Sequence, residues 1–240
     1  MRKPLGIKAY GSIPHLPESR MGPGDHHVHP GQAAIATVKT RDRYDIVRVQ
    51  EKLDGSNVAI ANVDGKICAL GRSGYLAQSS PHVQHQLFAA WVREREDVFA
   101  GILSDGERLC GEWLAQAHGT RYDLAGREPF VVFDLMRGAI RVPYDIFTER
   151  VAPYCALPRL IFEGRGACRV VYALEQLGCY GHYGARDVAE GCVWRVEHKG
   201  TVDFLCKYVR PDKIDGCYLP NVTGGEPVWN WRPIRLASFP

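Results

Sequence analysis

The segment Glu51-Lys-Leu-Asp-Gly-Ser-Asn57 lies between two stretches that are typical of β-strands, and it combines a lysine with a turn. Asp54-Gly55 predicts the turn, because glycine tolerates the backbone angles that a sharp bend needs. A lysine held before such a turn, beside other cations and partly desolvated, can lose its proton and attack phosphorus. The four residues Lys-x-Asp-Gly by themselves also fit a surface hairpin with a solvated lysine, so the surrounding sequence has to decide.

Apolar periodicity on both sides of this segment predicts strands and only a few helices. Residues 44–50 and 57–63 are expected to be strands, and Asp64-Gly65 predicts a hairpin turn into a third strand. Ser80-Pro81 resembles an N-cap and a first helical position, which predicts one helix over about 82–100. The fold class is therefore α+β with antiparallel sheets. The other expected elements are strands at 66–71, 108–114, 130–135, 191–197 and 202–209, a turn at 198–200 and a mixed helical region at about 143–180.

Five further short motifs follow the lysine segment in order. They are Gly71-Arg-Ser-Gly74, Gly111-Glu-Trp113, Phe130-Val-Val-Phe-Asp134, Glu190-Gly-Cys-Val193 and Phe204-Leu-Cys-Lys207. Together with the lysine segment they resemble the signature motifs of the covalent nucleotidyltransferases, the superfamily of ATP-dependent DNA ligases, RNA ligases and mRNA capping enzymes. The resemblance covers about residues 44–210, most of the chain.

This resemblance implies an ATP-grasp-like nucleotidyltransferase (adenylation) fold, in which two antiparallel sheets with flanking helices hold the nucleotide between them. Within the superfamily, the spacing and the Arg-Ser-Gly of the second motif are most similar to ATP-dependent RNA ligases that seal nicked duplex RNA, the RNA ligase 2-like enzymes. An N-terminal arm with Tyr10–His15 and Gly24–Gly31 also resembles bacterial proteins classed as RNA ligase family members.

The family chemistry that the resemblance implies has three steps. The lysine takes the adenylyl group of ATP and releases pyrophosphate, the adenylyl group passes to a 5′-phosphate end, and a 3′-hydroxyl attacks to seal the strands. Lys52 is then the catalytic nucleophile, and Lys207 neutralises the α-phosphate. Such phosphoryl transfer depends mainly on positioning and charge neutralisation.

The remaining motif residues suit nucleotide binding by their chemistry. The forked guanidinium of Arg72 can bind ribose or phosphate oxygens, and the carboxylate of Glu112 can accept a hydrogen bond from a ribose hydroxyl. The aromatic ring of Phe133 can stack on adenine. The alternatives are a surface arginine at 72, a strand-edge carboxylate at 112 and a plain core residue at 133. A bound Mg²⁺ or Mn²⁺ is expected at Glu190, with Asp134 as a weaker metal ligand. The expected nucleotide-binding residues are Glu51, Lys52, Asp54, Gly55, Arg72, Glu112, Phe133, Glu190 and Lys207.

Two departures from the family pattern weaken the substrate assignment. Phage nick-sealing RNA ligases often have histidine where this chain has Asp54, and aspartate is the form of DNA ligases and capping enzymes. The last motif usually carries two lysines that flank one residue, but here Leu205 or Val209 occupies one of the two places. The missing charge is expected from one of three cations, which are Lys199, Arg210 and Lys213.

The arm contains a cluster of histidines, His26, His27 and His29. Their spacing fits no standard metal site, and no cysteine or carboxylate pair completes one. The arm is expected to be an ordered loop, with a metal site or a contact to a substrate phosphate as alternatives.

Length and composition set the outer limits. With 240 residues the chain fits one domain, divided into the arm (1–43), a catalytic core (44–210) and a tail (211–240) that is too short for the OB-fold domain of DNA ligases. A net charge of +3 permits a nucleic-acid partner without requiring one. The eight cysteines form no C-x-x-C pair, and the N-terminus lacks a signal peptide, so a cytoplasmic protein without membrane segments is expected.

Three functions remain open at this stage. The favoured one is an ATP-dependent RNA ligase involved in RNA repair, acting on nicked duplex RNA or an RNA/DNA hybrid. The second is a minimal ATP-dependent DNA ligase, or a ligase-like enzyme whose protein partner supplies the grip on nucleic acid. The third is a nucleotide- or RNA-binding module with impaired chemistry, which the missing lysine suggests.

Overall fold

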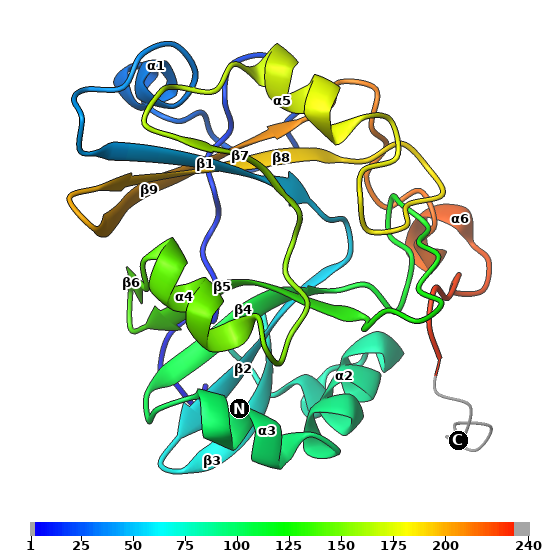
Figure 1. The fold of residues 1–240 in the computed structure, drawn as a ribbon. Coiled ribbons are helices and arrows are strands. Elements are labelled where there is room, and N and C mark those ends of the chain that lie inside the picture. The colour runs from blue at the N-terminus through cyan, green and yellow to red at the C-terminus, as the bar shows by residue number, and fades with distance from the viewer. Residues whose placement is uncertain (1–2, 233–240) are drawn as a thin grey trace.

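The computed structural model describes residues 3–232, and its strands form two antiparallel sheets that face each other across a cleft (Figure 1). The ends of the expected arm and tail, residues 1–2 and 233–240, lie outside the described residues. The α+β fold with antiparallel sheets is confirmed. The first sheet has the order β7-β1-β8-β9, with β7 Leu160–Gly164, β1 Asp45–Lys52, β8 Gly191–His198 and β9 Thr201–Val209. The second has the order β3-β2-β4-β5-β6, with β3 Lys66–Gly71, β2 Ser56–Val63, β4 Glu107–Trp113, β5 Phe130–Arg137 and β6 Ile140–Arg141.

Helices cover the outer face of each sheet, away from the cleft. The cores beneath them contain Trp194 in the first sheet and Phe88, Trp113 and Phe130 in the second. Among the described residues, no helix is long and apolar enough to span a bilayer. The helices of the first sheet are α1 Pro30–Thr37 and α5 Val170–Leu177, and those of the second are α2 Val83–Arg93, α3 Glu96–Ile102 and α4 Tyr144–Val151, with η1 Ala77–Ser79 and α6 Pro220–Thr223 in connecting segments.

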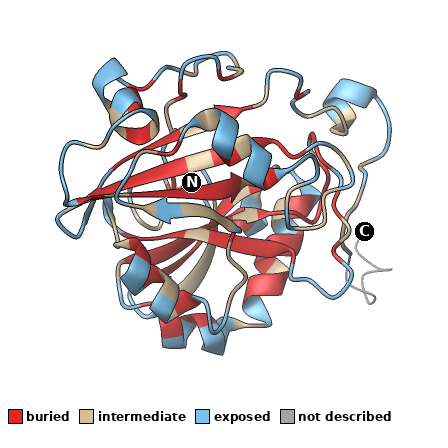
Figure 2. Cartoon of the chain, turned by 45° about the horizontal axis from the view of Figure 1, so that its top comes forward, coloured by how far each residue is buried: buried red, intermediate tan, exposed pale blue. Residues whose placement is uncertain are grey.

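Strand β1 shows why the cleft is polar. Successive side chains of a strand point to opposite faces of its sheet. Val47 and Val49 are fully buried in the core beneath α1 and α5. Gln50 and Lys52 alternate with them and line the cleft. The strands β1, β2, β4, β5 and β8 are therefore largely buried on both faces (Figure 2), one face against helices and the other toward the cleft.

Three helical expectations were wrong in detail. The helix expected over 82–100 is two helices, and the chain bends at Arg95 so that Trp91 and Phe99 pack in the same core, with ring centroids 5.7 Å apart. The mixed helical region contains strand β7, which pairs with the edge of β1. The arm contains α1, which starts at Pro30, where a missing backbone N–H costs nothing.

The N-terminal arm crosses the cleft and joins the two sheets. The backbone N–H groups of Ala9 and Tyr10 donate to the carbonyl of Arg72, beside the second sheet. A few residues later, the backbone of Pro14 and Leu16 pairs with Lys207 on β9 of the first sheet. The blue segment in Figure 1 follows this path from one sheet to the other.

Candidate active site

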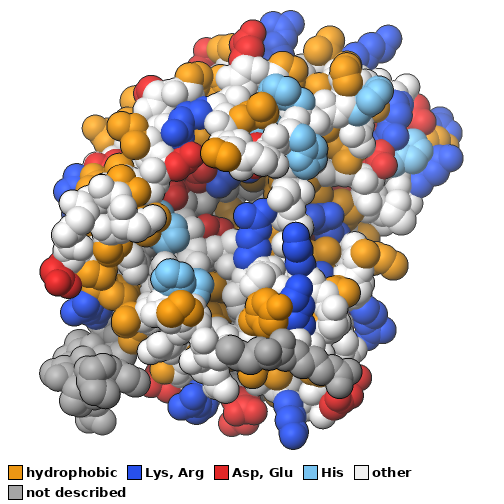
Figure 3. Space-filling view, turned by 180° about the vertical axis from the view of Figure 1, so that it is seen from behind, with side chains coloured by type: hydrophobic (Ala, Val, Ile, Leu, Met, Phe, Trp, Pro, Cys, Tyr) orange, Lys and Arg blue, Asp and Glu red, His pale blue; other side chains and the backbone are white. Residues whose placement is uncertain are grey.

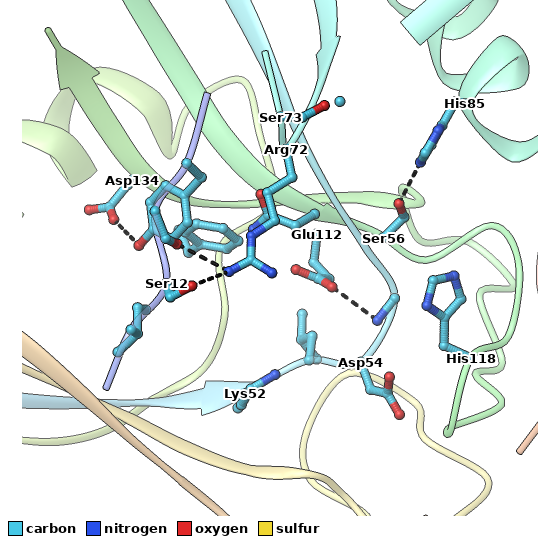
Figure 4. A pocket seen from close by; sticks show the side chains of 18 of the residues that line it. Ser12, Lys52, Asp54, Ser56, Arg72, Ser73, His85, Glu112, His118 and Asp134 are labelled. Carbon is cyan, nitrogen blue, oxygen red and sulfur yellow. Dashed lines mark hydrogen bonds between the residues drawn. The ribbon is translucent and has the colours of Figure 1, made fainter. Parts of the chain in front are cut away.

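A cavity of about 1170 Å³ fills the cleft between the sheets, and its walls contain the expected nucleotide-binding residues. Figure 4 shows side chains from both walls directed into this space, with Lys52 and Asp54 below Glu112. The hollowed face in Figure 3 carries a row of lysine and arginine side chains. The residues from Glu51 to Gly55, which the sequence singled out, thus lie in the cleft and not on an exposed hairpin. The expected nucleotide-binding residues that line the cavity are Glu51, Lys52, Asp54, Gly55, Arg72, Glu112, Phe133, Glu190 and Lys207.

Lys52 ends β1, and its ammonium group is held by carboxylates. Its Nζ donates to Oε2 of Glu190 at 2.6 Å, and only 21% of the side chain is exposed. Burial lowers the pKa of Lys52, but the charges of Glu190, Glu112 and Asp54 outweigh it and raise the pKa above its ordinary value. The structure therefore holds the lysine as a charged group.

Glu112 and Glu190 are acidic side chains whose burial in the cleft disfavours their charged forms. Burial raises the pKa of Glu112 to about 8, against the attraction of Lys52, with further increases from Glu190 and Asp54. Burial likewise raises the pKa of Glu190 to about 7. Both glutamates lie close to Lys52, and Glu190 is the one paired with its ammonium group.

The lysine segment Glu51–Asn57, called motif I from here on, contains a turn at Asp54-Gly55 that is fixed against the opposite sheet. The backbone N–H of Gly55 donates to Oε1 of Glu112 at 3.1 Å, and a Cβ on this glycine would come within 2.5 Å of the carbonyl oxygen of Trp113. Oδ2 of Asp54 accepts from the Thr120 hydroxyl at 3.0 Å and lies 3.4 Å from Nζ of Lys213. The turn therefore requires glycine at 55 and is anchored by Asp54.

The other wall of the cleft supplies an aromatic face and an exposed guanidinium. Phe133 is partly exposed and meets the ring of Tyr10 edge-on, with centroids 5.0 Å apart. The exposed Arg72 side chain donates to the Ser12 hydroxyl at 3.1 Å and to the Gly11 carbonyl at 3.4 Å. These contacts are weak enough for a nucleotide to replace them.

Asp134 does not fit the metal role that the sequence suggested. Its carboxylate is fully buried and accepts from the Tyr10 hydroxyl at 2.6 Å, from Nε of Arg141 at 3.1 Å and from Arg195. Because two guanidinium groups already neutralise and occupy the oxygens, the carboxylate has no place for an ion. Asp134 instead links β5 to β8 and to the arm.

Glu51 lies in the cavity wall, but its carboxylate serves the protein backbone. It accepts from the N–H of His182 at 3.0 Å and packs against Gly181, where a Cβ would be 2.0 Å from Oε1. Strand alternation places Glu51 and Lys52 on opposite faces of the sheet. The expected contribution of Glu51 to nucleotide binding is therefore limited to its backbone.

Lys207 lies on β9 inside the cleft with 18% of its side chain exposed. Burial and the nearby charge of Lys52 lower the pKa of Lys207. The three cations considered as a replacement for the missing lysine are not among the residues that line the cleft. Lys199 lies 5.6 Å from the Tyr44 ring centroid at the β8–β9 turn, Arg210 donates to the Gly178 carbonyl at 2.6 Å, and Lys213 is buried against the Gly119 carbonyl at 2.6 Å.

The histidine cluster of the arm does not form a metal site. Within residues 3–232, the one group with converging metal-ligand atoms is Asp42, Asp45 and His198, which does not include it. His29 caps α1 by accepting from the N–H of Gly31 at 3.2 Å.

Histidines that the sequence gave no reason to select line the cleft near motif I. His85 contacts the hydroxyls of Ser56 and Ser80, both at 2.8 Å, and burial lowers its pKa to about 4. His82 and His118 lie in the same wall. The three residues come from α2, its preceding loop and the segment after β4, so only the tertiary structure brings them together.

A lysine between two antiparallel sheets, surrounded by carboxylates, cations and an aromatic face, defines a nucleotidyltransferase domain. The family model of RNA ligases matches residues 45–209, and the chain therefore belongs to the RNA ligase family.

Comparison with solved structures agrees with this assignment at the level of the fold. An archaeal ATP-dependent RNA ligase (form 1) is similar with a TM-score of 0.51 and 20% identity, over 85% of this chain and 48% of that chain. A Naegleria gruberi RNA ligase mutant with ATP and Mn has a TM-score of 0.48 and 15% identity, over 70% of this chain and 51% of that chain. The chain thus spans about half the length of these ligases. No curated protein matches it.

Proposed function

We propose that this chain is an ATP-dependent RNA ligase that becomes adenylylated on Lys52 and joins a 5′-phosphate to a 3′-hydroxyl polynucleotide end. The observation that supports it most is the position of Lys52, which faces the cleft beside Glu190 and Glu112 and across from Arg72 and Phe133. Buried titratable groups with shifted pKa values beside a cavity are typical of functional sites.

The first step follows from this placement. Nζ of Lys52, once it has lost its proton, attacks the α-phosphorus of ATP, a P–N bond forms, and the bond to the bridging oxygen breaks as pyrophosphate leaves. Lys207 neutralises charge that develops on the α-phosphate, and its partial burial strengthens that effect. Phe133 offers a face for adenine, while Glu112 and Arg72 bind ribose and phosphate oxygens.

The donor set of the cleft fits a divalent cation. Glu190, Glu112 and Asp54 provide the hard oxygen atoms that such a cation prefers. Mg²⁺ or Mn²⁺ held by Glu190 would supply charge neutralisation for the triphosphate. A cation bound to Glu190 would compete with Lys52 for this carboxylate, and it would thereby remove the partner that keeps the Lys52 ammonium group protonated.

Auto-adenylylation tests the proposal directly. Incubation with [α-³²P]ATP and Mg²⁺ or Mn²⁺ should label the protein, and Lys52→Ala should abolish the label. Lys52→Arg should fail as well, because a guanidinium keeps its proton. Circular dichroism of both variants checks that they are folded. Labelling that survives Lys52→Ala would contradict the assignment of the nucleophile, whereas ATP binding without any label would favour a binding module with impaired chemistry.

The polynucleotide substrate is tested separately with nicked duplexes. RNA is proposed from the family, while Asp54 is the motif I form of DNA ligases and favours the second candidate, a minimal DNA ligase. Substrates with RNA or DNA on each side of the nick, including an RNA/DNA hybrid, should be sealed when the strand ends are RNA. Sealing of DNA ends alone would establish the DNA ligase, and labelling without any sealing would indicate a missing protein partner.

A further inference from the structure

The N-terminal arm places a buried histidine directly behind the phosphate-binding lysine. His15 is 1% exposed, and its Nδ1 lies 2.7 Å from the hydroxyl of Ser19. Its Nε2 lies 3.0 Å from Oδ2 of Asp25. The Ser19 hydroxyl oxygen accepts from the backbone N–H of Val209 at 2.9 Å, and Asp25 also accepts from the N–H of Gly22 at 3.0 Å. These contacts form a continuous chain from β9 to the Asp25 carboxylate.

The direction of the hydrogen bonds follows from the chemistry of each group. Burial and the nearby charge of Lys207 lower the pKa of His15, so its ring is neutral and carries one N–H. The pKa of Asp25 is lowered because the N–H of Gly22 and the charge of Lys207 outweigh its burial, so it is an ionised acceptor. Nδ1 of His15 therefore accepts from Ser19, and the single ring N–H is on Nε2, where it faces Oδ2 of Asp25 as a close electrostatic contact at 3.0 Å.

Asp25 ends this chain beside Lys207. Its second oxygen, Oδ1, lies 3.9 Å from Nζ of Lys207. The arm also fixes the lysine backbone, since the N–H of Lys207 donates to the Pro14 carbonyl at 3.0 Å and its carbonyl accepts from Leu16 at 2.8 Å. The arm thus holds Lys207 by both its backbone and its charge.

The charges around Lys207 give Asp25 a specific task. Lys52 on β1 and Arg72 after β3 disfavour the ammonium form, and burial acts in the same direction. Asp25 from the arm and Glu190 before β8 favour it. Glu190 is already paired with Lys52 at 2.6 Å, which leaves Asp25 as the carboxylate whose other oxygen is available to Lys207.

We infer that the Ser19–His15–Asp25 relay makes Asp25 a fixed counter-ion that keeps Lys207 charged and directed into the cleft. Asp25 and His15 are positioning residues in this scheme, because they act on ATP only through Lys207. The inference rests on the proposed function, in which Lys207 binds the α-phosphate. It assigns a role to the Gly24–Gly31 segment that metal binding does not explain.

The decisive comparison is the rate of auto-adenylylation of Asp25→Asn and wild-type protein as a function of pH. Loss of the carboxylate lowers the pKa of Lys207, and only the charged lysine neutralises phosphate. The variant should equal wild type near about pH 6 and fall behind as the pH rises, by about tenfold for each unit of pKa lost. Asp97→Asn, which removes the same charge from exposed α3, should behave like wild type throughout.

The same Asp25 substitution in Lys207→Arg protein separates an effect on the charge of residue 207 from an effect on the structure of the arm. In Lys207→Arg protein the cation stays charged at every accessible pH, so adding Asp25→Asn should no longer produce a deficit that grows with pH. His15→Gln can still donate to Asp25 and should resemble wild type, whereas His15→Phe should reproduce the pH-dependent deficit. Melting temperatures report any loss of stability from these buried substitutions separately.

A deficit of Asp25→Asn that is equal at all pH values, or no deficit, would overturn the inference and reduce the relay to an anchor for the arm. If wild-type protein shows no label at all, the proposed function has failed instead. The relay is still tested in that case by NMR titration of the Lys207 side chain in protein with isotope-labelled lysine. The pKa of Lys207 should be lower in Asp25→Asn than in wild type, and equal pKa values would refute the inference.

Discussion

At the scale of single residues, the cleft is built around an imbalance of charge. Lys52 faces Glu190, Glu112 and Asp54, and the two glutamates have pKa values of about 7 and about 8 as a result of burial and mutual repulsion. Such a site is costly for the isolated protein and becomes favourable when ATP and a cation enter. Residues that look unfavourable in the free protein are therefore the ones most directly tied to the reaction.

Lys207 should be indispensable for adenylylation. Lys207→Ala should cut the labelling rate by about a hundredfold or more, because it removes a charge from a shielded phosphate site. Wild-type labelling by Lys207→Ala would show that the last motif has been misplaced.

Adding a lysine at Leu205 should not restore the family pattern. Leu205 lies in the cleft wall directly opposite Arg195 in the β8–β9 pairing, so a new ammonium meets a like charge. We expect Leu205→Lys to adenylylate no faster than wild type and to melt at a lower temperature. Faster labelling or tighter ATP binding by this variant would show that the cleft lacks a charge at this position.

Glu112→Gln should lower the labelling rate and raise the stability of the folded protein at high pH. The folded protein raises the pKa of Glu112 from its ordinary 4.5 to about 8, so ionising this group costs stability increasingly as the pH rises through that interval. The amide oxygen of glutamine can still accept from Gly55. The melting temperature of Glu112→Gln should match wild type near pH 4.5 and exceed it near pH 8, while labelling falls. A wild-type advantage that grows with pH would contradict the assigned sign.

At the scale of elements, the turn between β1 and β2 positions Lys52 because Gly55 is fixed against β4. Gly55 fits because its missing side chain leaves space for the Trp113 carbonyl, and Asp54 is tied to Thr120 and Lys213. This anchoring explains aspartate at position 54 structurally, independent of the polynucleotide that is joined. It also explains why Lys213 cannot reach a phosphate.

Gly55→Ala should therefore disable the site through its geometry. The added Cβ would lie 2.5 Å from the Trp113 carbonyl oxygen, so the turn has to move and the bond to Glu112 is lost. We expect at least a tenfold loss of labelling, and a loss of stability of about 1–3 kcal/mol from overpacking. The control is Gly65→Asn in the β2–β3 turn, where a Cβ meets open space and asparagine tolerates the positive φ. Equal activity of the Gly55 and Gly65 variants would contradict this account.

At the scale of the whole molecule, two sheets have to be held at the spacing that a nucleotide requires. The arm crosses from one sheet to the other, and the Asp134 cluster joins β5 to β8 with two arginines and Tyr10. These buried polar links lie next to the site, so the same residues that stabilise the fold also set the width of the cleft.

Asp134→Ala should destabilise the protein without a specific effect on metal use. It leaves Arg141 and Arg195 uncompensated in a buried place, which costs about 3–5 kcal/mol and lowers the melting temperature by roughly 6–20 °C. The dependence of labelling on Mg²⁺ concentration in the remaining folded protein should equal that of wild type. If Asp134→Ala needed a much higher Mg²⁺ concentration than wild type for labelling, this would support the metal-binding role of Asp134 that the sequence predicted.

Most strands and the order of the motifs could be read from the sequence, because their determinants are local. Period-2 apolar alternation specifies a strand wherever one face is buried, and the Asp64-Gly65 and Lys199-Gly200 turns have the positive φ angles that close two-residue hairpins. Strand β7 was missed because its pairing with the edge of β1 is a long-range contact. The division of the 82–100 helix was missed because the bend is set by packing of Trp91 and Phe99.

The sequence by itself determined the family, the lysine and the set of side chains around it, because motif chemistry depends on residue type and order. Only the tertiary structure decided which of these side chains are free to act. It showed that the Asp134 carboxylate is paired with two arginines and that the Glu51 carboxylate accepts from the backbone N–H of His182. It also showed that Lys213 is paired with Asp54. It also brought Asp25 and His15 to Lys207. A charge acts through distance and burial, and neither is fixed until the two sheets and the arm have packed together.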